Sequence, residues 1–565
     1  MGQQVKSWCR QHERLLIFIS FLLLSGLSLY FVYFQENFLR ASDFRFHQNR
    51  VEGLALAIKN NDWFPKINYF FLGGYGYASS LFYPDAYLYL PALLRVLGLS
   101  FVASMAIFVF AVNLATFSLT YYAGRLMALS KKRSYIFAIL YGLSIYRMQD
   151  LFNRQALGEF LALSFFPLVL ASLFLLRKGT TKYWPLLTLA MTGIGLAHFI
   201  SIEMVSIWIG LYILFYWQQF FKKEVLLALA KAAGLTLLWL AFYLLPVAEQ
   251  MKNQVFKVTS NPLTYISERS YPIDSLFINS LKSSVFHAKT ANLGTLLFVG
   301  LVVAVVSLAS KKIQDKRFIG LTLVLLLMVT TLFPWHWLNH TPLNTIQFPW
   351  RFLGILSVML AFFIAQDEWG VFRKSWTVAL LVFLAISNLG IYQYQSIQSQ
   401  QGHLLTKAEY EQPTPFYIGA GHEYLPDEIN YQELLKQKKR QLDYSAEQVT
   451  ITNVRMPYGK ISFDYQVVNQ SAKVTVPFIY YLGYQATIQM KNQTGAKKMS
   501  LTNQGGLAAL SLSGTGHVDI RYQRTKVQKI GTMITLLSVG GFGFSRFLQQ
   551  KKETQDKRTT MKVGP

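Results

Sequence analysis

Three polar side chains in the segment ASDFRFHQNR have the types and the spacing of a reactive site. If this segment is helical, Asp43, His47 and Arg50 stand at positions i, i+4 and i+7, which lie on one face of a helix. A carboxylate, an imidazole and a guanidinium on one face can deprotonate a hydroxyl, bind a divalent ion or hold a phosphate. The alternative interpretation is that these three residues form only the polar side of an interfacial helix whose phenylalanines face lipid.

A second group of candidate residues lies in RQALGEF, residues 154–160, shortly after Asp150. Glu159 is expected near the N-terminus of a membrane-spanning helix, where the helix dipole stabilises a carboxylate. Helix-end electrostatics alone would explain such a residue. A carboxylate that begins a membrane span is nevertheless costly, which favours a functional acid at this position.

The motif QFPWR, which begins at Gln347, places Arg351 at the outer end of a predicted span. Positive charges on the outer side oppose the usual cytoplasmic bias, and a planar guanidinium suits two-point binding of a phosphate. A lipid phosphate is therefore the predicted partner, and snorkelling of these side chains to headgroups is the alternative. The other arginines predicted on this side are Arg45, Arg50, Arg147 and Arg154.

Two further motifs lie on the predicted outer side of the membrane. His198 is a candidate proton carrier or ligand, with a purely structural histidine as the alternative. The run GGYGY at residues 73–77 lacks a GxxxxGK pattern and therefore predicts no nucleotide site. Its GYG is that of a potassium filter, but the pore helix and fourfold assembly of a filter are not indicated. We expect a loop whose aromatic side chains bind a sugar or a lipid. It includes Tyr75 and is followed by Tyr83, and an ordinary turn without a binding role is the alternative.

Membrane-spanning helices are the elements that must position these residues. Of the 565 residues, 52% are hydrophobic and only 15% are charged, and the mean hydropathy is +0.29. These values indicate lipid as the solvent. About twelve spans are predicted, at residues 15–34, 101–124, 134–147, 159–176, 185–200, 202–217, 224–246, 292–310, 318–335, 351–366, 376–393 and 529–547.

Basic clusters predict the orientation of these spans. The net charge of +26 arises mostly from Lys and Arg between apolar runs, so it indicates topology and not nucleic-acid binding. With these clusters on one side, both termini are cytoplasmic, and the long connections 36–100, 247–291 and 394–528 are outside. The single cysteine, Cys9, can form no intrachain disulfide. The clusters begin at Lys6, Arg10 and Arg14 and continue at 125–133, 177–178, 222–223, 311–317, 373–374 and from Lys551 onward.

Two apolar stretches are short for a span. Residues 83–97 include Asp85 and Arg95, which are expensive inside a bilayer, so we predict an interfacial helix that leads into the second span. Residues 134–147 are kept as a span, because the basic clusters before and after them require two crossings in between.

The last outer segment, residues 394–528, changes character to period-two alternation broken by Asn, Gly and Ser, which is typical of strands. A small β-sandwich is predicted, preceded by a polar, partly helical stretch at 402–445. The predicted organisation is a transmembrane domain at 1–393, this extracytoplasmic mainly-β domain at 394–528, and a last span with a basic cytoplasmic tail at 529–565. The six strands are expected at 448–454, 460–467, 473–481, 485–490, 508–513 and 517–522.

In the order of its motifs the chain resembles the bacterial YfhO-like membrane proteins, also described by a 6-pyruvoyl-tetrahydropterin-synthase-related domain. These proteins are similar to the C-type membrane glycosyltransferases, which have the GT-C fold. The resemblance spans nearly the whole chain, and the pterin label implies no pterin chemistry. It rests on SDFRFHQNR at 42–50, GGYGY with FYP at 73–84, RQALGEF at 154–160, QFPWRF at 347–352 and VPFIYYLGY at 476–484.

The resemblance implies transfer of a hexosyl or N-acetylhexosaminyl group from a polyprenyl-phosphate donor to an envelope glycopolymer or glycolipid outside the cell membrane. It implies that Asp43 promotes attack, that Glu159 completes the acidic site, and that Asp43, Asp150 and Glu159 are the candidate ligands of a divalent metal ion. No paired DxD motif is present for that metal, and no other cofactor is expected. Expected partners besides donor, acceptor and bilayer are a donor-synthesising transferase and a flippase. The residues expected to bind substrate are His47, Arg50, Tyr75, Tyr83, Arg154, His198, Gln347 and Arg351.

Two other classes of function are carried as alternatives. A lipid or polymer transporter would also contain many helices, but its charges would gather at the membrane midplane and its halves would be related, neither of which the sequence indicates. A noncatalytic envelope assembly protein, which would recruit partners through the β-domain, would not depend on Asp43 or Glu159.

Overall fold

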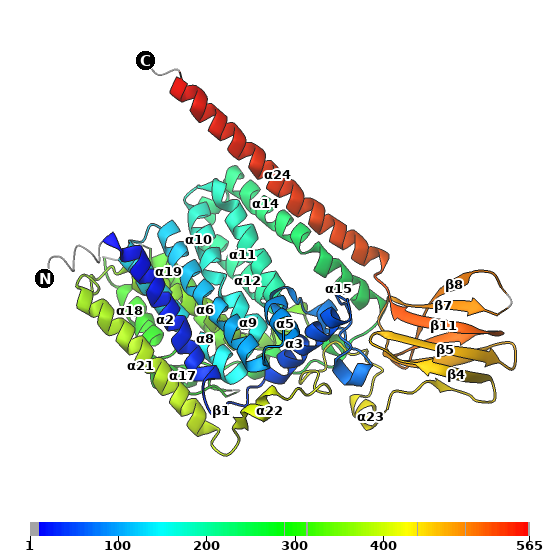
Figure 1. Cartoon of the computed structure of the whole chain (residues 1–565). Helices are drawn as coiled ribbons and strands as arrows, with labels where there is room; N and C mark the ends of the chain where they lie inside the picture. The colour runs from blue at the N-terminus through cyan, green and yellow to red at the C-terminus, as the bar shows by residue number, and fades with distance from the viewer. Residues whose placement is uncertain (1–10, 288, 312–314, 438, 492, 563–565) are drawn as a thin grey trace. The chain divides into compact units, whose positions relative to one another are not determined.

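The computed structural model of the chain describes residues 11–562 apart from 288, 312–314, 438 and 492, so that Lys6, Cys9 and Arg10 lie outside the described residues. The chain forms two compact units (Figure 1). The helical unit comprises Met1–Ala228, Phe256–Leu425 and Asn430–Lys438, and the β unit comprises Leu229–Val255, Pro426–Ile429 and Lys439–Pro565. Most of the polar stretch before the strands therefore packs with the helical unit.

Helices occupy all twelve apolar runs predicted as spans. Ser100 and Ser130 cap the helices α6 and α7 by accepting hydrogen bonds from the backbone N–H groups of Ala103 and Arg133. The main helices of the helical unit are α2 (Glu13–Tyr33), α3 (Phe44–Lys59), α5 (Tyr89–Val96), α6 (Phe101–Leu126), α7 (Lys131–Gly142), α8 (Ile145–Gln149), α9 (Leu157–Leu163), α10 (Phe166–Arg177), α11 (Trp184–Ala197), α12 (Phe199–Phe215), α17 (Ile273–Lys282), α18 (Thr295–Ser307), α19 (Lys316–Val329), α20 (Leu353–Gln366), α21 (Ser375–Ser399), α22 (Lys407–Glu411) and α23 (Tyr431–Lys436).

Length and composition make the chain a multi-pass membrane protein. By these criteria the described residues contain 6 helices able to cross a membrane, or up to 7 when the bent pair α14 (Lys223–Trp239) and α15 (Ala241–Asn253) counts as one span. Several other helices, such as α18, are apolar but shorter than a full span. The prediction of about twelve crossings therefore stays a prediction.

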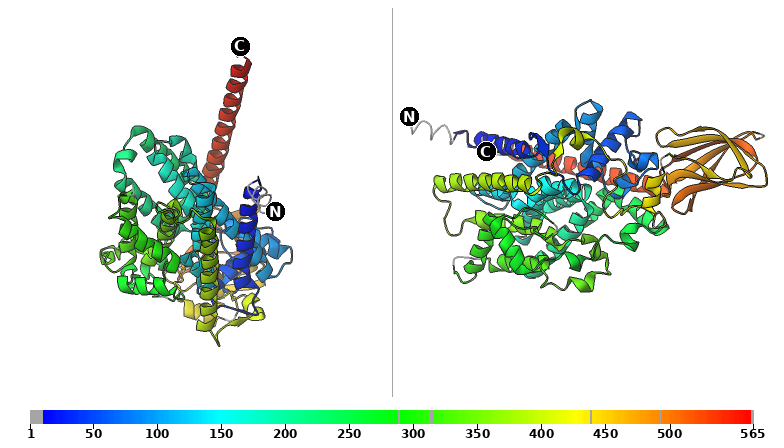
Figure 2. Two further views of the ribbon diagram at one scale, coloured as in Figure 1. Left: turned by 90° about the vertical axis from the view of Figure 1, so that its left-hand side faces the viewer. Right: turned by 90° about the horizontal axis from the view of Figure 1, so that it is seen from below.

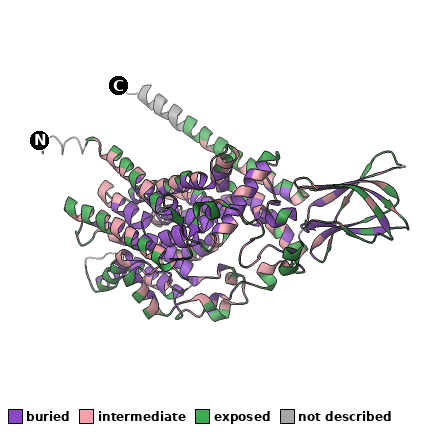
Figure 3. Cartoon of the chain, turned by 60° about the horizontal axis from the view of Figure 1, so that its bottom comes forward, coloured by how far each residue is buried: buried purple, intermediate pink, exposed green. Residues whose placement is uncertain are grey.

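Burial separates inner from outer helices in the helical unit (Figure 3). The span formed by α9 and α10 and the span that contains α20 are each 89% buried, whereas the spans in α2 and α21 are 28% buried. A helix that is apolar on all sides is stable in water only when other helices surround it. The exposed side chains of the outer helices, such as Leu23 and Phe383, are therefore expected to face lipid.

Ion pairs of the helical unit join loops that are predicted to share a side of the membrane. Lys131 pairs with Glu13 at 2.7 Å and Arg177 with Asp315 at 2.6 Å, and all four residues are predicted at the cytoplasmic side. Arg50 pairs with Asp85 and Arg154 with Asp43, and these four are predicted outside. The grouping supports the predicted alternation of the loops.

Cysteine labelling tests which side is which. In a Cys9→Ser background, we expect Lys497→Cys in β8 (Ala496–Ser500) to react with an impermeant maleimide in spheroplasts, because residues 394–528 are predicted outside. Glu368→Cys, between α20 and α21, should react only after permeabilisation. Both positions are exposed. If Lys497→Cys reacts only after permeabilisation, the outer placement of residues 394–528 is wrong.

The β unit contains the six predicted strands, each within two residues of the predicted bounds, and three short additional ones. Two antiparallel sheets form, in the orders β3-β6-β10-β9 and β4-β5-β11-β7-β8. Phe478 of β6 stacks on Tyr484 of β7 at 5.0 Å, which joins the buried faces of the two sheets and confirms the sandwich. The strands are β3 (Asp443–Tyr444), β4 (Val449–Arg455), β5 (Lys460–Val467), β6 (Ala472–Ile479), β7 (Tyr484–Met490), β8 (Ala496–Ser500), β9 (Thr502–Gln504), β10 (Leu507–Leu512) and β11 (Thr515–Tyr522).

A close helix crossing completes the β unit. The pair α14 and α15 is bent by 69°, and the last helix, α24 (Lys526–Lys562), packs on α15. A Cβ added at Gly531 would lie 2.6 Å from the carbonyl oxygen of Ala241, so only glycine permits this approach. Thr535 binds both helices of the pair, accepting a hydrogen bond from the Phe242 N–H at 3.0 Å and donating to the Leu238 carbonyl at 3.1 Å.

Candidate functional site

The first outer loop is held directly to the second. The segment considered as a possible helix is helical: α3 begins after Asp43, and the Asp43 backbone N–H donates to the carbonyl of Arg154 at 2.9 Å. The Asp43 carboxylate accepts from the Ser42 hydroxyl at 3.0 Å and from Arg154 Nη2 at 3.4 Å. Its side chain remains 40% exposed. Asp43 is therefore an acid that solvent or a substrate can reach while a buried guanidinium touches it.

His47 and Arg50 lie one and two turns further along α3 and are both buried. Arg50 Nη2 donates to the carbonyls of Tyr83 and Pro84 and to Asp85 at 2.8–3.0 Å, so its charge holds the turn at residues 83–85. His47 Nδ1 lies 3.4 Å from Arg50 Nη1 and must accept there, because a guanidinium only donates. Burial, and then the charge of Arg50, lower the pKa of His47, which keeps the imidazole neutral.

The alternative of an interfacial helix with lipid-facing phenylalanines is wrong for Phe44. Its ring is buried and stacks on Tyr410 at 4.0 Å. Phe46 is half-buried and lies beside the ring of His47 at 5.4 Å. The apolar residues of α3 thus pack within the protein.

Tyr83 and His198 line the site next to α9. The Tyr83 hydroxyl packs on Gly158, where an added Cβ would lie 1.7 Å from the oxygen, so RQALGEF needs its glycine for this contact. The His198 ring lies 5.9 Å from the Tyr83 ring. His198 Nδ1 is 2.8 Å from the Ser201 hydroxyl, which leaves Nε2 for another partner.

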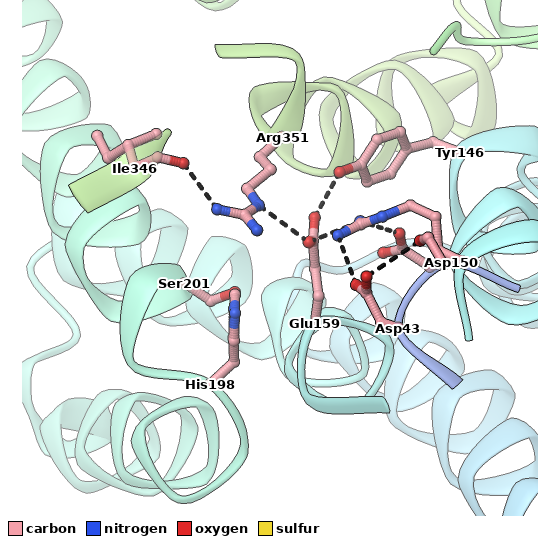
Figure 4. A network of polar contacts seen from close by, with 10 residues as sticks. Asp43, Tyr146, Asp150, Glu159, His198, Ser201, Ile346 and Arg351 are labelled. Carbon is pink, nitrogen blue, oxygen red and sulfur yellow. Dashed lines mark hydrogen bonds and ion pairs between the residues drawn. The ribbon is translucent and has the colours of Figure 1, made fainter. Parts of the chain in front are cut away.

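Arg154 is the centre of the acidic cluster (Figure 4). It ends a π-helical turn, Asp150–Arg154, a feature that often marks functional sites. Its Nη1 donates to Asp150 and, at 2.8 Å, to Glu159, and its Nη2 faces Asp43. The structure therefore brings all three predicted acids together, around a guanidinium.

This arrangement does not fit the predicted metal site. One carboxylate oxygen of each of Asp43, Asp150 and Glu159 faces Arg154, and a fixed positive charge at that point repels a divalent ion. No group of three His, Cys, Asp or Glu side chains suited to a metal occurs among the described residues. The guanidinium supplies the charge that a metal would have brought.

Asp150 is the most deeply buried acid of the cluster. Burial, and then the neighbouring carboxylate of Glu159, raise the pKa of Asp150 well above its ordinary value, and the charge of Arg154 opposes this rise. Its Oδ2 is buried and has no hydrogen-bond partner among the described residues.

Arg351 approaches the cluster from the start of the span that contains α20. Its Nε donates to Glu159 at 3.2 Å, and its Nη1 donates to the Ile346 carbonyl at 2.7 Å. Nη2 has no hydrogen-bond partner within the described part of the chain. Gln347, next to Ile346, has φ +60°, a strained value for a residue other than glycine, and its side chain is half-buried. Arg351 therefore has one donor to offer to a bound anion.

Two predicted residues lie elsewhere. Tyr75 is buried, and its hydroxyl donates to Gln437, so the GGYGY run is a packed turn. Arg147 is buried beneath the site, where it donates to Asn113 at 2.8 Å and Thr116 at 3.0 Å. Neither side chain contacts the acidic cluster.

The sequence did not point to two aromatic members of the site. The Tyr146 hydroxyl donates to Glu159, and the Trp350 ring lies 4.7 Å from the Arg154 guanidinium. Trp350 stands inside QFPWRF, so the motif contained the residue but only its arginine was interpreted. For Tyr146 the available signal was its place at the end of a short, weakly apolar span.

Comparisons with known proteins give a family and distant structural likenesses. The model of a family described as "6-pyruvoyl-tetrahydropterin synthase related domain; membrane protein" matches residues 81–397. An uncharacterised protein of Lactococcus lactis subsp. cremoris is 23% identical over 615 aligned positions that cover 95% of either chain. The arabinofuranosyltransferase AftD from Mycobacteria matches with a TM-score of 0.42 and 12% identity, over 67% of this chain and 26% of AftD. ArnT from Cupriavidus metallidurans, solved bound to undecaprenyl phosphate, matches with a TM-score of 0.40 and 12% identity, over 69% of this chain and 76% of ArnT.

Proposed function

This chain belongs to the family of membrane proteins with a 6-pyruvoyl-tetrahydropterin synthase related domain, and we propose that it is a membrane glycosyltransferase. It moves a sugar from a polyprenyl-phosphate donor to a cell-envelope glycopolymer or glycolipid on the outer face of the cell membrane. One observation carries the proposal: a half-exposed carboxylate, Asp43, touches a buried cluster in which Nη2 of Arg351 has no hydrogen-bond partner among the described residues. A base and an anion-binding group are what this reaction needs.

The reaction divides between these two residues. The Asp43 carboxylate takes the proton of an acceptor hydroxyl, whose oxygen forms a bond to C1 of the donor sugar. The bond between C1 and the phosphate oxygen breaks, and its electron pair leaves with the polyprenyl phosphate. Arg351 Nη2 donates a hydrogen bond to that phosphate as the negative charge of the phosphate grows. This contact lowers the activation barrier of the transfer, because the guanidinium is already oriented before the reaction begins.

The neighbouring residues position these two. Glu159 accepts from both Arg154 and Arg351 and so aligns the two guanidiniums. Neutral His47, Tyr83 and Nε2 of His198, which has no hydrogen-bond partner among the described residues, offer hydrogen bonds to sugar hydroxyls or to the phosphate. Gln347 follows Ile346, whose carbonyl accepts from Arg351. The energy of transfer arrives in the donor, so no nucleotide is needed at the site; a transferase and a flippase must supply the donor from the cytoplasm.

Envelope composition tests the function. A deletion strain should lose one envelope sugar and accumulate the matching polyprenyl-linked sugar, and complementation should reverse both changes. Loss of the envelope polymer itself, without accumulation of a lipid-linked sugar, would favour the transporter or assembly alternatives.

The role of Arg351 is tested by Arg351→Lys, which keeps a positive charge but loses the planar fork. We expect the KM for the lipid-linked donor to rise about tenfold or more, because a hydrogen bond to a charged group is lost. Arg269→Lys, another change of a predicted outer arginine, is the matched control and should leave the KM unchanged. Wild-type kinetics for Arg351→Ala would remove Arg351 from the phosphate site.

A further inference from the structure

Helix α3 has a second polar face that the proposed reaction does not use. Arg45 donates to the carbonyls of Glu409 at 2.8 Å and Gln412 at 2.7 Å. Gln48 donates to the Tyr410 carbonyl at 2.9 Å. The acceptors lie 362–367 residues further along the chain, and we call residues 405–425 the strap.

The yellow strap runs beside the blue first outer loop and α3 (Figure 2), and polar contacts join them at several points. Asn49 donates to the carbonyls of Thr414 at 2.6 Å and Tyr417 at 2.9 Å, and accepts from the Thr414 N–H at 3.2 Å. The start of the strap pairs with the first outer loop as strands β1 (Asn37–Phe38) and β2 (Leu405–Thr406). Backbone atoms held by this many side-chain bonds cannot shift far relative to α3.

The end of the strap is fixed as firmly. The Tyr424 N–H donates to the Tyr77 hydroxyl at 3.0 Å, and the Tyr424 ring stacks on Phe82 at 5.1 Å. The Glu423 carbonyl accepts from the Val258 N–H at 3.0 Å. These contacts fix the backbone on both sides of the Glu423 side chain.

The Glu423 carboxylate lies against Gly419 and Gly421 of the strap, and Gly419 in turn lies next to Phe46 of α3. A Cβ built on Gly419 would lie 3.5 Å from Glu423 Oε2 and 3.9 Å from the ring of Phe46. Phe46 stands in α3 between Arg45, which binds the strap, and His47, which belongs to the proposed site. Glu423 is half-buried, and no Lys, Arg or His forms an ion pair with it among the described residues.

Electrostatics place Glu423 in the field of the proposed site. Burial raises the pKa of Glu423, and hydrogen bonds from the backbone N–H groups of Glu423 and Gly421 oppose this rise; the Asp43 charge raises the pKa and the Arg351 charge lowers it. Burial, Asp43 and then Glu423 also raise the pKa of Tyr417. Asp43, Tyr417 and Glu423 are therefore close enough for their charges to interact.

We propose that the strap forms the acceptor wall of the site and that Glu423 binds a pair of hydroxyls on a carbohydrate acceptor, opposite Asp43. This inference rests on the proposed function. A carboxylate has about four acceptor positions, so beside the backbone N–H groups of Gly421 and Glu423 it can still accept two hydroxyl hydrogen bonds. The rings of Phe46 and Tyr417 suit the apolar face of a sugar ring. Glu423 thus orients the hydroxyl that Asp43 deprotonates, and it takes no proton itself.

The test separates acceptor binding from donor binding. The probes are the purified full-length protein in lipid nanodiscs and the envelope glycopolymer extracted from the deletion strain, which carries unmodified acceptor sites. Glu423→Gln should raise the KM for this glycopolymer about tenfold or more and leave the donor KM unchanged. Glu423→Asp, which retracts the carboxylate but keeps its charge, should raise the same KM. Glu433→Gln, an exposed acid of α23, is the control and should have wild-type values.

The outcomes distinguish the inference from the function on which it rests. If the wild type transfers sugar and Glu423→Gln keeps a wild-type acceptor KM, or changes only the donor KM, the inference is wrong and the function stands. If the wild type transfers no sugar, the proposed function is wrong. Direct binding of the glycopolymer then decides: binding weakened by Glu423→Gln but not by Glu433→Gln supports the acceptor wall, and equal binding overturns it.

Discussion

Asp43→Asn should reduce sugar transfer by about 10²- to 10⁴-fold, the usual contribution of a general base. Asparagine has nearly the same shape and still accepts the hydrogen bond from Ser42, but it cannot take the acceptor proton. Because the Asp43 side chain is 40% exposed and lies 3.4 Å from Arg154, loss of this ion pair should cost little stability. The measurement is the initial rate of transfer at saturating donor and acceptor, normalised to the amount of folded protein.

A matched change separates base catalysis from surface charge. Glu36→Gln removes an exposed acid from the same outer loop and should leave the rate unchanged. Normal membrane levels of Asp43→Asn with transfer lost would support chemistry at this residue. Retained transfer by both Asp43→Asn and Glu159→Gln would contradict the proposal and favour the noncatalytic alternative.

Glu159→Gln should destabilise the protein strongly, by about 3–5 kcal/mol, because it leaves two buried guanidiniums without their shared carboxylate. Glu159 accepts from Arg154 at 2.8 Å and from Arg351 at 3.2 Å, and a glutamine amide would turn an N–H group toward one of these donors. We expect a lower unfolding temperature in detergent and less protein in the membrane. The control is Glu203→Gln, a half-buried acid that accepts from the Thr345 hydroxyl at 2.6 Å; its effect should be much smaller.

The Glu159 experiment also distinguishes a structural from a chemical role. A normal unfolding temperature with transfer lost would make Glu159 a second catalytic acid and contradict its assignment as the residue that aligns the two arginines. A lower unfolding temperature with a normal rate per folded molecule would leave it purely structural.

Sequence reasoning predicted the local elements of the site well. The spacing of Asp43, His47 and Arg50 places them on one face if the segment is helical, and the structure shows helix α3 beginning after Asp43. Side-chain periodicity is a property of neighbouring residues, so it can be read without a fold. The same holds for the six strands of the β unit, whose alternation is equally local.

The partners of these residues could not be predicted in this way. The sequence contained the three acids and the arginines but not their pairing, and it suggested a metal where Arg154 provides the charge. Arg45 was interpreted as a phosphate-binding arginine, whereas it holds backbone carbonyls of the strap. Each of these pairings depends on which helix ends meet, and no local pattern contains that information.

By itself the sequence determined what each stretch of the chain is: apolar runs that require lipid or burial, basic loops that predict their side, alternating strands, and polar motifs at the predicted outer ends. Only the tertiary structure decided which of these motifs meet. It joined Asp43, Arg154, Glu159 and Arg351 in one cluster, kept Arg147 and Tyr75 out of it, and set the strap, which carries Glu423, beside α3. The physical reason is that hydropathy and periodicity are sums over neighbouring residues, whereas a site is made by contacts between residues far apart in the chain, which exist only once the helices have packed.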